Sequence, residues 1–245
     1  VKGVSIHNVY GPHPAGNVGV QIGKISPINA GERVWTVTPQ DVATIGELFL
    51  TGKFNATRTV ALVGSEVKDA QYYNVISGAA IADLVAGKIE GDNVRVISGD
   101  VLTGTKVKMD GNLGFLSNTV TVIPEGNVYR MFGWMPFASP SVHSASRTGL
   151  SWLMPGKKYA PNTNLNGEER ALVVTGEMET VMPLDIFPMQ LLKACLASDI
   201  DKMESLGIYE VAPEDFALID YTNTSKLEAQ QIIREALDLM IKEVG

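Results

Sequence analysis

Residues 11–19 form the stretch whose residue types come closest to a ligand-binding motif; they read Gly-Pro-His-Pro-Ala-Gly-Asn-Val-Gly. Glycine lets the backbone approach a ligand closely, and a turn with free N–H groups is the usual device for holding a phosphate. Pro12 and Pro14 each remove a donor that such a site needs. The spacing also matches neither G-x-G-x-x-G nor G-x-x-x-x-G-K-[ST]. The stretch therefore favours a rigid structural turn formed by Gly11, Pro12, Pro14 and Gly16 over a nucleotide site.

The remaining reactive side chains form no catalytic set in the sequence. The three histidines, His7, His13 and His143, stand in no H-E-x-x-H pattern, and no G-x-S-x-G is present. The single cysteine, Cys195, excludes a disulfide within the chain and any cluster held by several thiolates. Its neighbours in the sequence are apolar, which indicates a packing role. We therefore expect no catalytic residue, no metal ligand and no cofactor held by this chain.

An aromatic and methionine-dense region between residues 129 and 159 is broken by turn residues. One interpretation is an adaptable apolar surface for a flat aromatic ligand or a partner subunit, since exposed patches of this kind mark binding sites. The alternative is core filler under long loops. The residues that would form the surface are Tyr129, Trp134, Phe137, Trp152 and Met154.

Composition narrows the class of protein further. The chain has 245 residues and a formal net charge of −7, and no basic stripe is visible, so a nucleic-acid partner is not expected. No run of about 18 apolar residues exists, so we expect no transmembrane segment. The single cysteine fits a reducing compartment. Because the chain opens on Val1 within strand-like alternation, we expect it to be a fragment of a longer protein.

The elements that would carry these residues fall into three regions. Residues 4–9 and 34–37 read as strands, and 38–52 as a helix with a Thr38 cap, Pro39 at its first position and an apolar stripe that predicts burial. Residues 58–107 give strand, strand, helix and strand, with Ser77 as the helix cap, which is the β-grasp pattern.

The second half of the chain changes character from strand to helix. Residues 119–132 predict a hairpin that turns at 125–127, and residues 171–175 predict a further strand. Helices follow from 188, 198 and 213, and Ser225 with Glu228 predicts a capping box for the last one.

Several collinear motifs resemble the A subunit of the bacterial sodium-translocating NADH:quinone reductase. The match covers nearly the whole chain and corresponds to about the C-terminal half of that subunit. The motifs are GPHPAG at 11–16, TPQDV at 38–42, IGELFLTG at 45–52, RVISG at 95–99, VLTG at 101–104, VMPLDI at 181–186 and EDFAL at 214–218.

The resemblance implies an α+β fold in three parts. These are the C-terminal part of a Rossmann-like, nucleotide-fold-like α/β domain (1–56), a soluble ligand-binding type β-grasp domain with a β-hairpin extension (57–180), and a helical domain (181–245). Residues 11–19 would then join the missing half to the β-grasp domain. On this interpretation we expect Gly16→Ala to weaken folding or docking more than ligand affinity.

The resemblance also implies a function. The chain would be a peripheral, cofactor-free subunit of a redox-driven sodium pump at the cytoplasmic face of the bacterial inner membrane, docked mainly on membrane subunits and not catalytic in isolation. FAD, FMN, riboflavin and an iron centre would lie in other subunits, and quinone would be the substrate. The aromatic region would meet either the quinone or a membrane subunit.

Two alternatives remain open at this point. One is a free-standing ligand-binding β-grasp protein, for example for a cobalamin or a sugar. The other is an Rnf-type electron-transfer subunit that has lost its clusters. Family members often carry cysteines at the places of Ile219 and Asn223, and their absence here argues against a redox role for residues 218–226.

Overall fold

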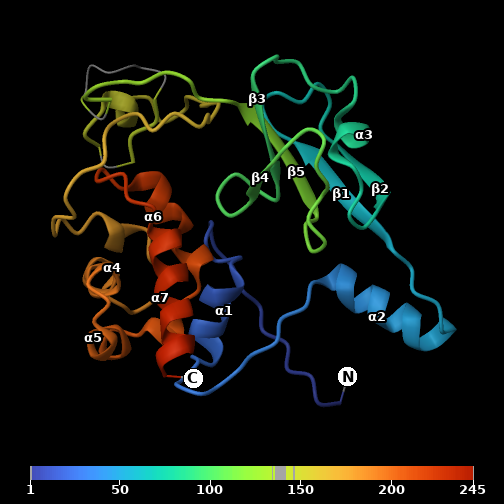
Figure 1. The fold of residues 1–245 in the computed structure, drawn as a ribbon, viewed down its shortest axis with the longest axis horizontal. Helices are drawn as coiled ribbons and strands as arrows, with labels where there is room; N and C mark the ends of the chain where they lie inside the picture. The colour runs from blue at the N-terminus through green and yellow to red at the C-terminus, as the bar shows by residue number, and fades with distance from the viewer. Residues whose placement is uncertain (1, 134, 136–141, 146, 245) are drawn as a thin grey trace. The chain divides into compact units, whose positions relative to one another are not determined.

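The computed structural model describes residues 2–133, 135, 142–145 and 147–244. These residues form two compact units, each with its own hydrophobic core. The sheet unit comprises residues 36–143 and 149–167, and the helical unit comprises residues 1–35, 144–148 and 168–245 (Figure 1). Each unit is therefore built from segments that are discontinuous in the sequence.

A five-stranded mixed sheet organises the sheet unit (Figure 1). The strand order is β2-β1-β5-β3-β4; β5 runs parallel to β1, and the other neighbours are antiparallel. The bounds are β1 Thr57–Val63, β2 Gln71–Ile76, β3 Val94–Ser98, β4 Thr105–Val107 and β5 Thr119–Pro124. The α+β character and the strand, strand, helix, strand order predicted for residues 58–107 are thus confirmed.

One face of this sheet packs against the short helix α3, Ile81–Val85. Val60, Leu62, Val120 and Val122 alternate along β1 and β5 and are fully buried in this core. The predicted Ser77 cap is wrong, because Ala80 precedes the helix and the Ser77 hydroxyl donates to the Phe115 carbonyl instead.

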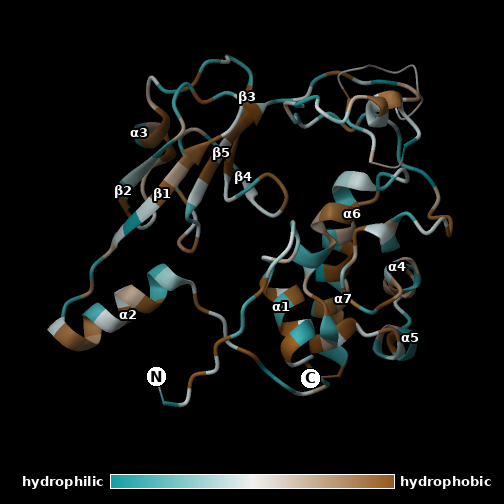
Figure 2. Ribbon diagram, turned by 180° about the vertical axis from the view of Figure 1, so that it is seen from behind, coloured by the Kyte–Doolittle hydropathy of each residue, from teal (hydrophilic) through white to brown (hydrophobic). Residues whose placement is uncertain are grey.

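Helix α2, Pro39–Thr51, begins and ends as the sequence predicts. Thr38 and Asp41 form the capping box, and Gly52 closes the helix with φ +69°. The prediction that its apolar stripe is buried is wrong, because no residue of α2 is buried and Phe49 is 85% exposed. Figure 2 shows hydrophobic residues along this helix.

Polar contacts hold the first turn of α2 to strand β1. Gln40 hydrogen-bonds both the carbonyl (3.0 Å) and the N–H (2.8 Å) of Thr59. Beside it, the buried guanidinium of Arg58 donates to the Asp41 carboxylate at 3.0 Å. Side-chain bonds, not apolar packing, therefore fix α2 to the sheet.

The predicted hairpin at 119–132 is wrong after Pro124. Strand β5 ends there, and the chain continues as an extended segment instead of turning back at 125–127. The N–H groups that a hairpin would pair are taken by distant side chains: Gly126 donates to Thr163 and Val128 to Asn164. The hydrogen-bond acceptors of this segment are therefore side chains nearly forty residues later, not the backbone of a hairpin strand.

The helical unit packs its helices around one apolar core (Figure 1). Its elements are α1 Val18–Ile25, η2 Met178–Thr180, α4 Pro188–Leu196, α5 Ile200–Ser205, η3 Ile208–Glu210, η4 Pro213–Phe216, α6 Ala217–Thr222 and α7 Ala229–Glu243. The strands predicted at 4–9, 34–37 and 171–175 are not present, since these residues pair with no strand among those described. The helices predicted from residues 188, 198 and 213 are confirmed within one or two residues.

Helix α7 has a different cap from the one predicted. The Ser225 and Glu228 capping box is wrong; the Asp220 carboxylate receives the N–H groups of Ala229 and Gln230 instead. Burial raises the pKa of Asp220, against the lowering effect of these hydrogen bonds. A carboxylate from the preceding helix therefore stabilises the start of α7.

Candidate functional site

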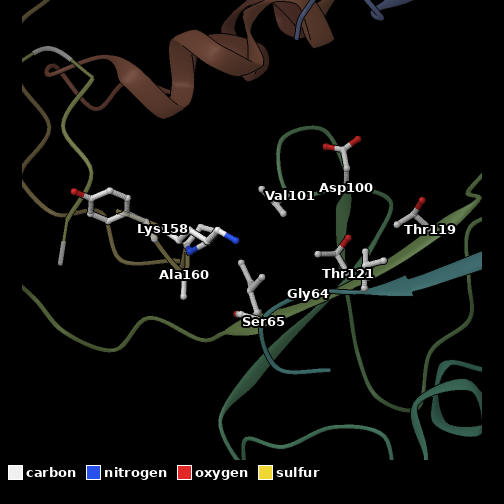
Figure 3. A pocket seen from close by; sticks show the side chains of 12 residues that line it. Gly64, Ser65, Asp100, Val101, Thr119, Thr121, Lys158 and Ala160 are labelled. Atoms are coloured by element: carbon white, nitrogen blue, oxygen red, sulfur yellow. The ribbon is translucent and has the colours of Figure 1, made fainter. Parts of the chain in front are cut away.

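A pocket of about 640 Å³ lies within the sheet unit, on the side of β5 that faces away from α3. Figure 3 shows it bounded by the end of β1, the turn after β3 and an extended segment of residues 157–163, called the strap below. The lining residues are Val63, Gly64, Ser65, Asp100, Val101, Thr119, Thr121, Ile123, Lys158, Tyr159, Ala160 and Pro161.

The alternation of side chains along β5 creates the floor of the pocket. Val120 and Val122 point into the core, so Thr119, Thr121 and Ile123 point to the opposite face. Gly64 is required where β1 leaves the sheet, because its φ is +126° and a Cβ there would lie 1.9 Å from the carbonyl oxygen of Val122. The floor is therefore fixed to the core by the same strand.

The carboxylate of Asp100, which lines the pocket, accepts hydrogen bonds from the turn after β3. One oxygen of Asp100 accepts the N–H groups of Leu102 (2.7 Å) and Thr103 (2.9 Å), and the other accepts the Thr103 hydroxyl at 2.8 Å. Burial alone would raise the pKa of Asp100, but the bonds from Thr103 and Leu102 outweigh it and the pKa is lowered. Asp100 is thus an ionised structural residue of its own turn.

The polar groups left for a ligand are few. The Thr121 hydroxyl donates to the Gly99 carbonyl at 2.7 Å and is also engaged. Among the described residues, the hydroxyls of Ser65 and Thr119 and the exposed ammonium of Lys158 have no hydrogen-bond or ion-pair partner. The pocket therefore offers a largely apolar surface with one cation and two hydroxyls.

A charged cluster at the edge of the sheet anchors the strap beside the pocket. Glu125 accepts hydrogen bonds from Arg95 (2.5 and 3.0 Å), Lys106 (3.2 Å) and the Thr163 hydroxyl (3.0 Å). Thr163 in turn accepts the Gly126 N–H at 2.7 Å. The bonds from Arg95, opposed by desolvation, lower the pKa of Glu125 to about 2.

This cluster predicts a specific acid sensitivity. An acid whose pKa is depressed in the folded state stabilises that state above its unfolded pKa, and the contribution is lost as the pH falls toward the folded pKa. We expect the free energy of unfolding of Glu125→Gln to lie below that of the unmodified chain at neutral pH, and the gap to close between about pH 4.5 and about pH 2. Urea unfolding at several pH values measures it. A gap that does not change with pH would contradict the assignment.

The residues predicted as an aromatic binding surface are only partly described. Tyr129, Trp152 and Met154 are 76%, 52% and 38% exposed, whereas Trp134 and Phe137 lie outside the described residues. Their role as a ligand or partner surface stays a prediction.

Residues 11–16 form a turn in which Ala15 and Asn17 donate to the carbonyls of Pro12 and Pro14. Gly11 adopts φ +142°, which favours glycine, but a Cβ on Gly16 would meet nothing within 4 Å. The structure therefore gives no packing reason for a folding penalty at Gly16. The glycine that packing does require is Gly19, where a Cβ would lie 2.2 Å from the Asp215 carboxylate.

The helical unit shows how polar bonds shape the loop before α7. The fully buried Asn223 side chain donates to the carbonyls of Ile219 (2.7 Å) and Leu227 (3.2 Å) and accepts the Leu227 N–H.

Cys195 is buried, and desolvation raises the pKa of its thiol to about 11, which fits the predicted packing role. No group of three or more potential metal ligands occurs among the described residues.

The sequence patterns that single out residues 11–19 and 129–159 do not reveal the pocket. Its lining comes from four separate stretches of ordinary residue types, and of the lining residues only Val101 falls within a family motif. The one usable signal is the alternation at residues 119–123. It predicts a strand that places Val120 and Val122 on one face and Thr119, Thr121 and Ile123 on the other.

Comparison with known families defines the class of protein. Residues 1–54 match the model described as NqrA second alpha/beta domain, and residues 59–109 match the NQRA C-terminal domain. The described sheet lies mainly in the second match, and α1 and α2 lie in the first.

Three relatives belong to one kind of complex. The A subunit of the Na(+)-translocating NADH-quinone reductase of Neisseria meningitidis serogroup B is 39% identical over 241 residues, which is 98% of this chain and 54% of the relative. The proteins of the same name from Serratia proteamaculans and Vibrio campbellii are 39% and 37% identical, over 98% of this chain and 54% of each relative. The chain is thus a homologue of the C-terminal half of the A subunit, and the resemblance predicted from its motifs is confirmed. It spans about half the length of the curated relatives it matches.

Proposed function

We propose that this chain serves as a peripheral part of a sodium-translocating NADH:quinone reductase, in which it has a docking and quinone-binding role. The observation that carries the proposal is the identity of 39% to the A subunit over 98% of the chain. We place it at the cytoplasmic face of the bacterial inner membrane. No helix among the described residues is long and apolar enough to cross a bilayer. FAD, FMN, riboflavin and an iron centre are assigned to other subunits.

The first 54 residues expose apolar side chains that the rest of their α/β domain would cover in the full-length protein. Trp35, Phe49 and Leu50 are 93%, 85% and 88% exposed, and Ile6 is 83% exposed. Side chains of this kind gain free energy when a partner covers them, at about 25 cal/mol per Å² of apolar surface. Because the same residues match an α/β domain of NqrA, we assign their cover to the preceding half of the full-length protein.

Solubilisation of native membranes tests the proposal. A tagged form of the chain, joined to the preceding half of a relative, is expected to co-migrate on size exclusion with a large flavin-containing complex. A variant with Phe49→Glu and Leu50→Glu on α2 should reduce this co-migration, because these side chains are assigned to the contact with the preceding half. Neither side chain is buried within the sheet unit, so that unit should stay folded. Migration of the intact fusion as a small free protein would contradict the assignment.

That last outcome would favour the alternative function, a free-standing ligand-binding β-grasp protein. The pocket on the sheet is the observation that keeps this alternative in view. Binding of a cobalamin or a sugar by the isolated chain, together with absence from any flavin-containing complex, would support it.

A further inference from the structure

We propose that strand β2 is an interaction surface and that its partner is a second copy of this chain. The β2 strands of the two copies pair antiparallel about a two-fold axis at Asn74, so that both sheets continue as one. Figure 1 shows β2 at one edge of the sheet, and β4 forms the other edge. The inference goes beyond the proposed function, because it rests on the edge of the sheet and not on membership of a reductase.

The two edges of the sheet differ in how they are protected. Native proteins usually keep an edge strand short, charged or interrupted by proline, because its unpaired N–H and C=O groups can bind another chain. Strand β4 follows this rule, since it has three residues and carries Lys106. Strand β2 has six residues, QYYNVI, with no charge, no proline and no glycine, and most of them favour strands. The edge at β2 is therefore the one that is open to strand addition.

The backbone of β2 presents a defined set of hydrogen-bonding groups at this edge. Just beyond the strand ends, Ser77 donates its N–H to the Ala56 carbonyl at 2.9 Å, so these two residues form a bonded pair of the ladder between β1 and β2. Bonded pairs alternate with unbonded ones in an antiparallel ladder. The N–H and C=O groups of Tyr72, Asn74 and Ile76 therefore point away from β1. Of these groups, only the Ile76 carbonyl has a partner among the residues that the structure describes, in the turn that follows β2.

One register pairs all of these groups with a second β2 strand. When Asn74 lies opposite Asn74 of the second copy, these two residues exchange backbone hydrogen bonds, and Tyr72 of each copy lies opposite Ile76 of the other. A register displaced by two residues would leave Tyr72 or Ile76 without an opposite residue in β2. Tyr72 and Ile76 are 79% and 68% exposed in the single chain, and an aromatic ring beside a β-branched side chain is a favourable cross-strand pair.

The side chains at the axis are also self-complementary. The Asn74 side-chain oxygen accepts the Thr59 hydroxyl at 2.9 Å, which leaves its amide N–H groups for the facing Asn74. No like charges meet along the paired strands, because β2 carries none. Tyr73 and Val75 stay packed on the core of their own copy, so the pairing requires no rearrangement of the sheet.

Cysteine cross-linking of the chain measures the register directly. The native Cys195 is buried, so introduced thiols report alone. We expect Asn74→Cys to give a disulfide-linked dimer under mild oxidation, since facing residues lie within disulfide range. Tyr72→Cys alone should not cross-link, because the two copies of residue 72 would lie about 13 Å apart along the strands. A mixture of Tyr72→Cys and Ile76→Cys should give the mixed dimer.

Sedimentation equilibrium tests the association without a covalent bond. The unmodified chain should show a monomer–dimer equilibrium that depends on concentration. Asn74→Lys places two like charges on the axis and should raise the dissociation constant about tenfold. The matched control is Thr105→Lys on the exposed edge strand β4, which should leave the dissociation constant unchanged. An unchanged urea midpoint for the monomeric variants shows that each is folded.

Three results would overturn the proposal. A chain that stays monomeric at every accessible concentration would show that the edge does not pair. Self-cross-linking of Tyr72→Cys as fast as that of Asn74→Cys would show random collision or another register. A dimer that Phe49→Glu weakens and Asn74→Lys does not would place the association on the exposed apolar face of α2.

Discussion

Replacing Gly19 by alanine is expected to lower the free energy of unfolding of the helical unit by about 3 kcal/mol. The added Cβ would lie 2.2 Å from one oxygen of Asp215 and 2.7 Å from the other. Asp215 is 2% exposed and accepts the Ala212 N–H at 2.9 Å, so moving it would leave that donor unpaired. Helix α1 would therefore have to leave its place beside η4.

Gly16→Ala is the matched control, because a Cβ there meets nothing within 4 Å. Hydrogen exchange of the α1 amides, read together with urea unfolding, should show loss of protection only for Gly19→Ala. The double variant Gly19→Ala with Asp215→Ala removes the obstructing carboxylate, so its effect should fall below the sum of the two single effects. Equal destabilisation by Gly16→Ala and Gly19→Ala would contradict the packing argument.

Replacing Arg58 by methionine should destabilise the sheet unit by about 3 kcal/mol and release α2 from β1. The guanidinium is buried and donates to Asp41 (3.0 Å), to the Asn118 side chain (2.9 Å) and to the Phe115 carbonyl (3.1 Å). Methionine keeps the apolar stem but leaves the Asn118 side-chain oxygen and one Asp41 oxygen without this donor, while the Phe115 carbonyl keeps only the Ser77 hydroxyl. It also removes the positive charge beside Asp41, whose pKa is lowered chiefly by the Thr38 hydroxyl and then by Arg58.

The control is Arg33→Met, an exposed arginine that should change stability little. Hydrogen exchange distinguishes the expected mechanism from general unfolding, since the α2 amides should lose protection while those of β3 and β5 keep theirs. Loss of protection across the whole sheet at the same rate would show that Arg58 supports the core as a whole. No loss at either place would show that α2 is held by other contacts.

Local signals predict the helices and strands of this chain well where the partner is close in sequence. The Thr38, Pro39 and Gly52 signals give α2 its bounds, and the pattern at 58–107 gives the strand, strand, helix, strand order. The errors arise where a distant residue supplies what a near one was expected to supply. Asp220 caps α7 in place of Ser225, and Thr163 takes the hydrogen bond expected for a hairpin at residue 126.

The candidate site follows the same rule. Glycine and proline density draws attention to residues 11–19, and aromatic density to residues 129–159, because both are visible in a short window of sequence. The pocket depends on strand pairing between β1 and β5, which are more than fifty residues apart, and on a strap held by Glu125. The lining residues are common types at four separate places in the sequence, so no local pattern predicts that the folded sheet brings them together.

The discontinuous make-up of the two units has a consequence for how the chain can be divided. The backbone passes from one unit to the other after residues 35, 143, 148 and 167. The stretch 36–167 contains the whole sheet unit with residues 144–148 of the helical unit inside it, whereas the helical unit is divided between both ends of the chain. A protease that cuts after residue 35 or 167 therefore divides the helical unit and leaves the sheet unit in one piece. The sheet unit can thus be cut out as one piece, while the helical unit needs both ends of the chain to be complete.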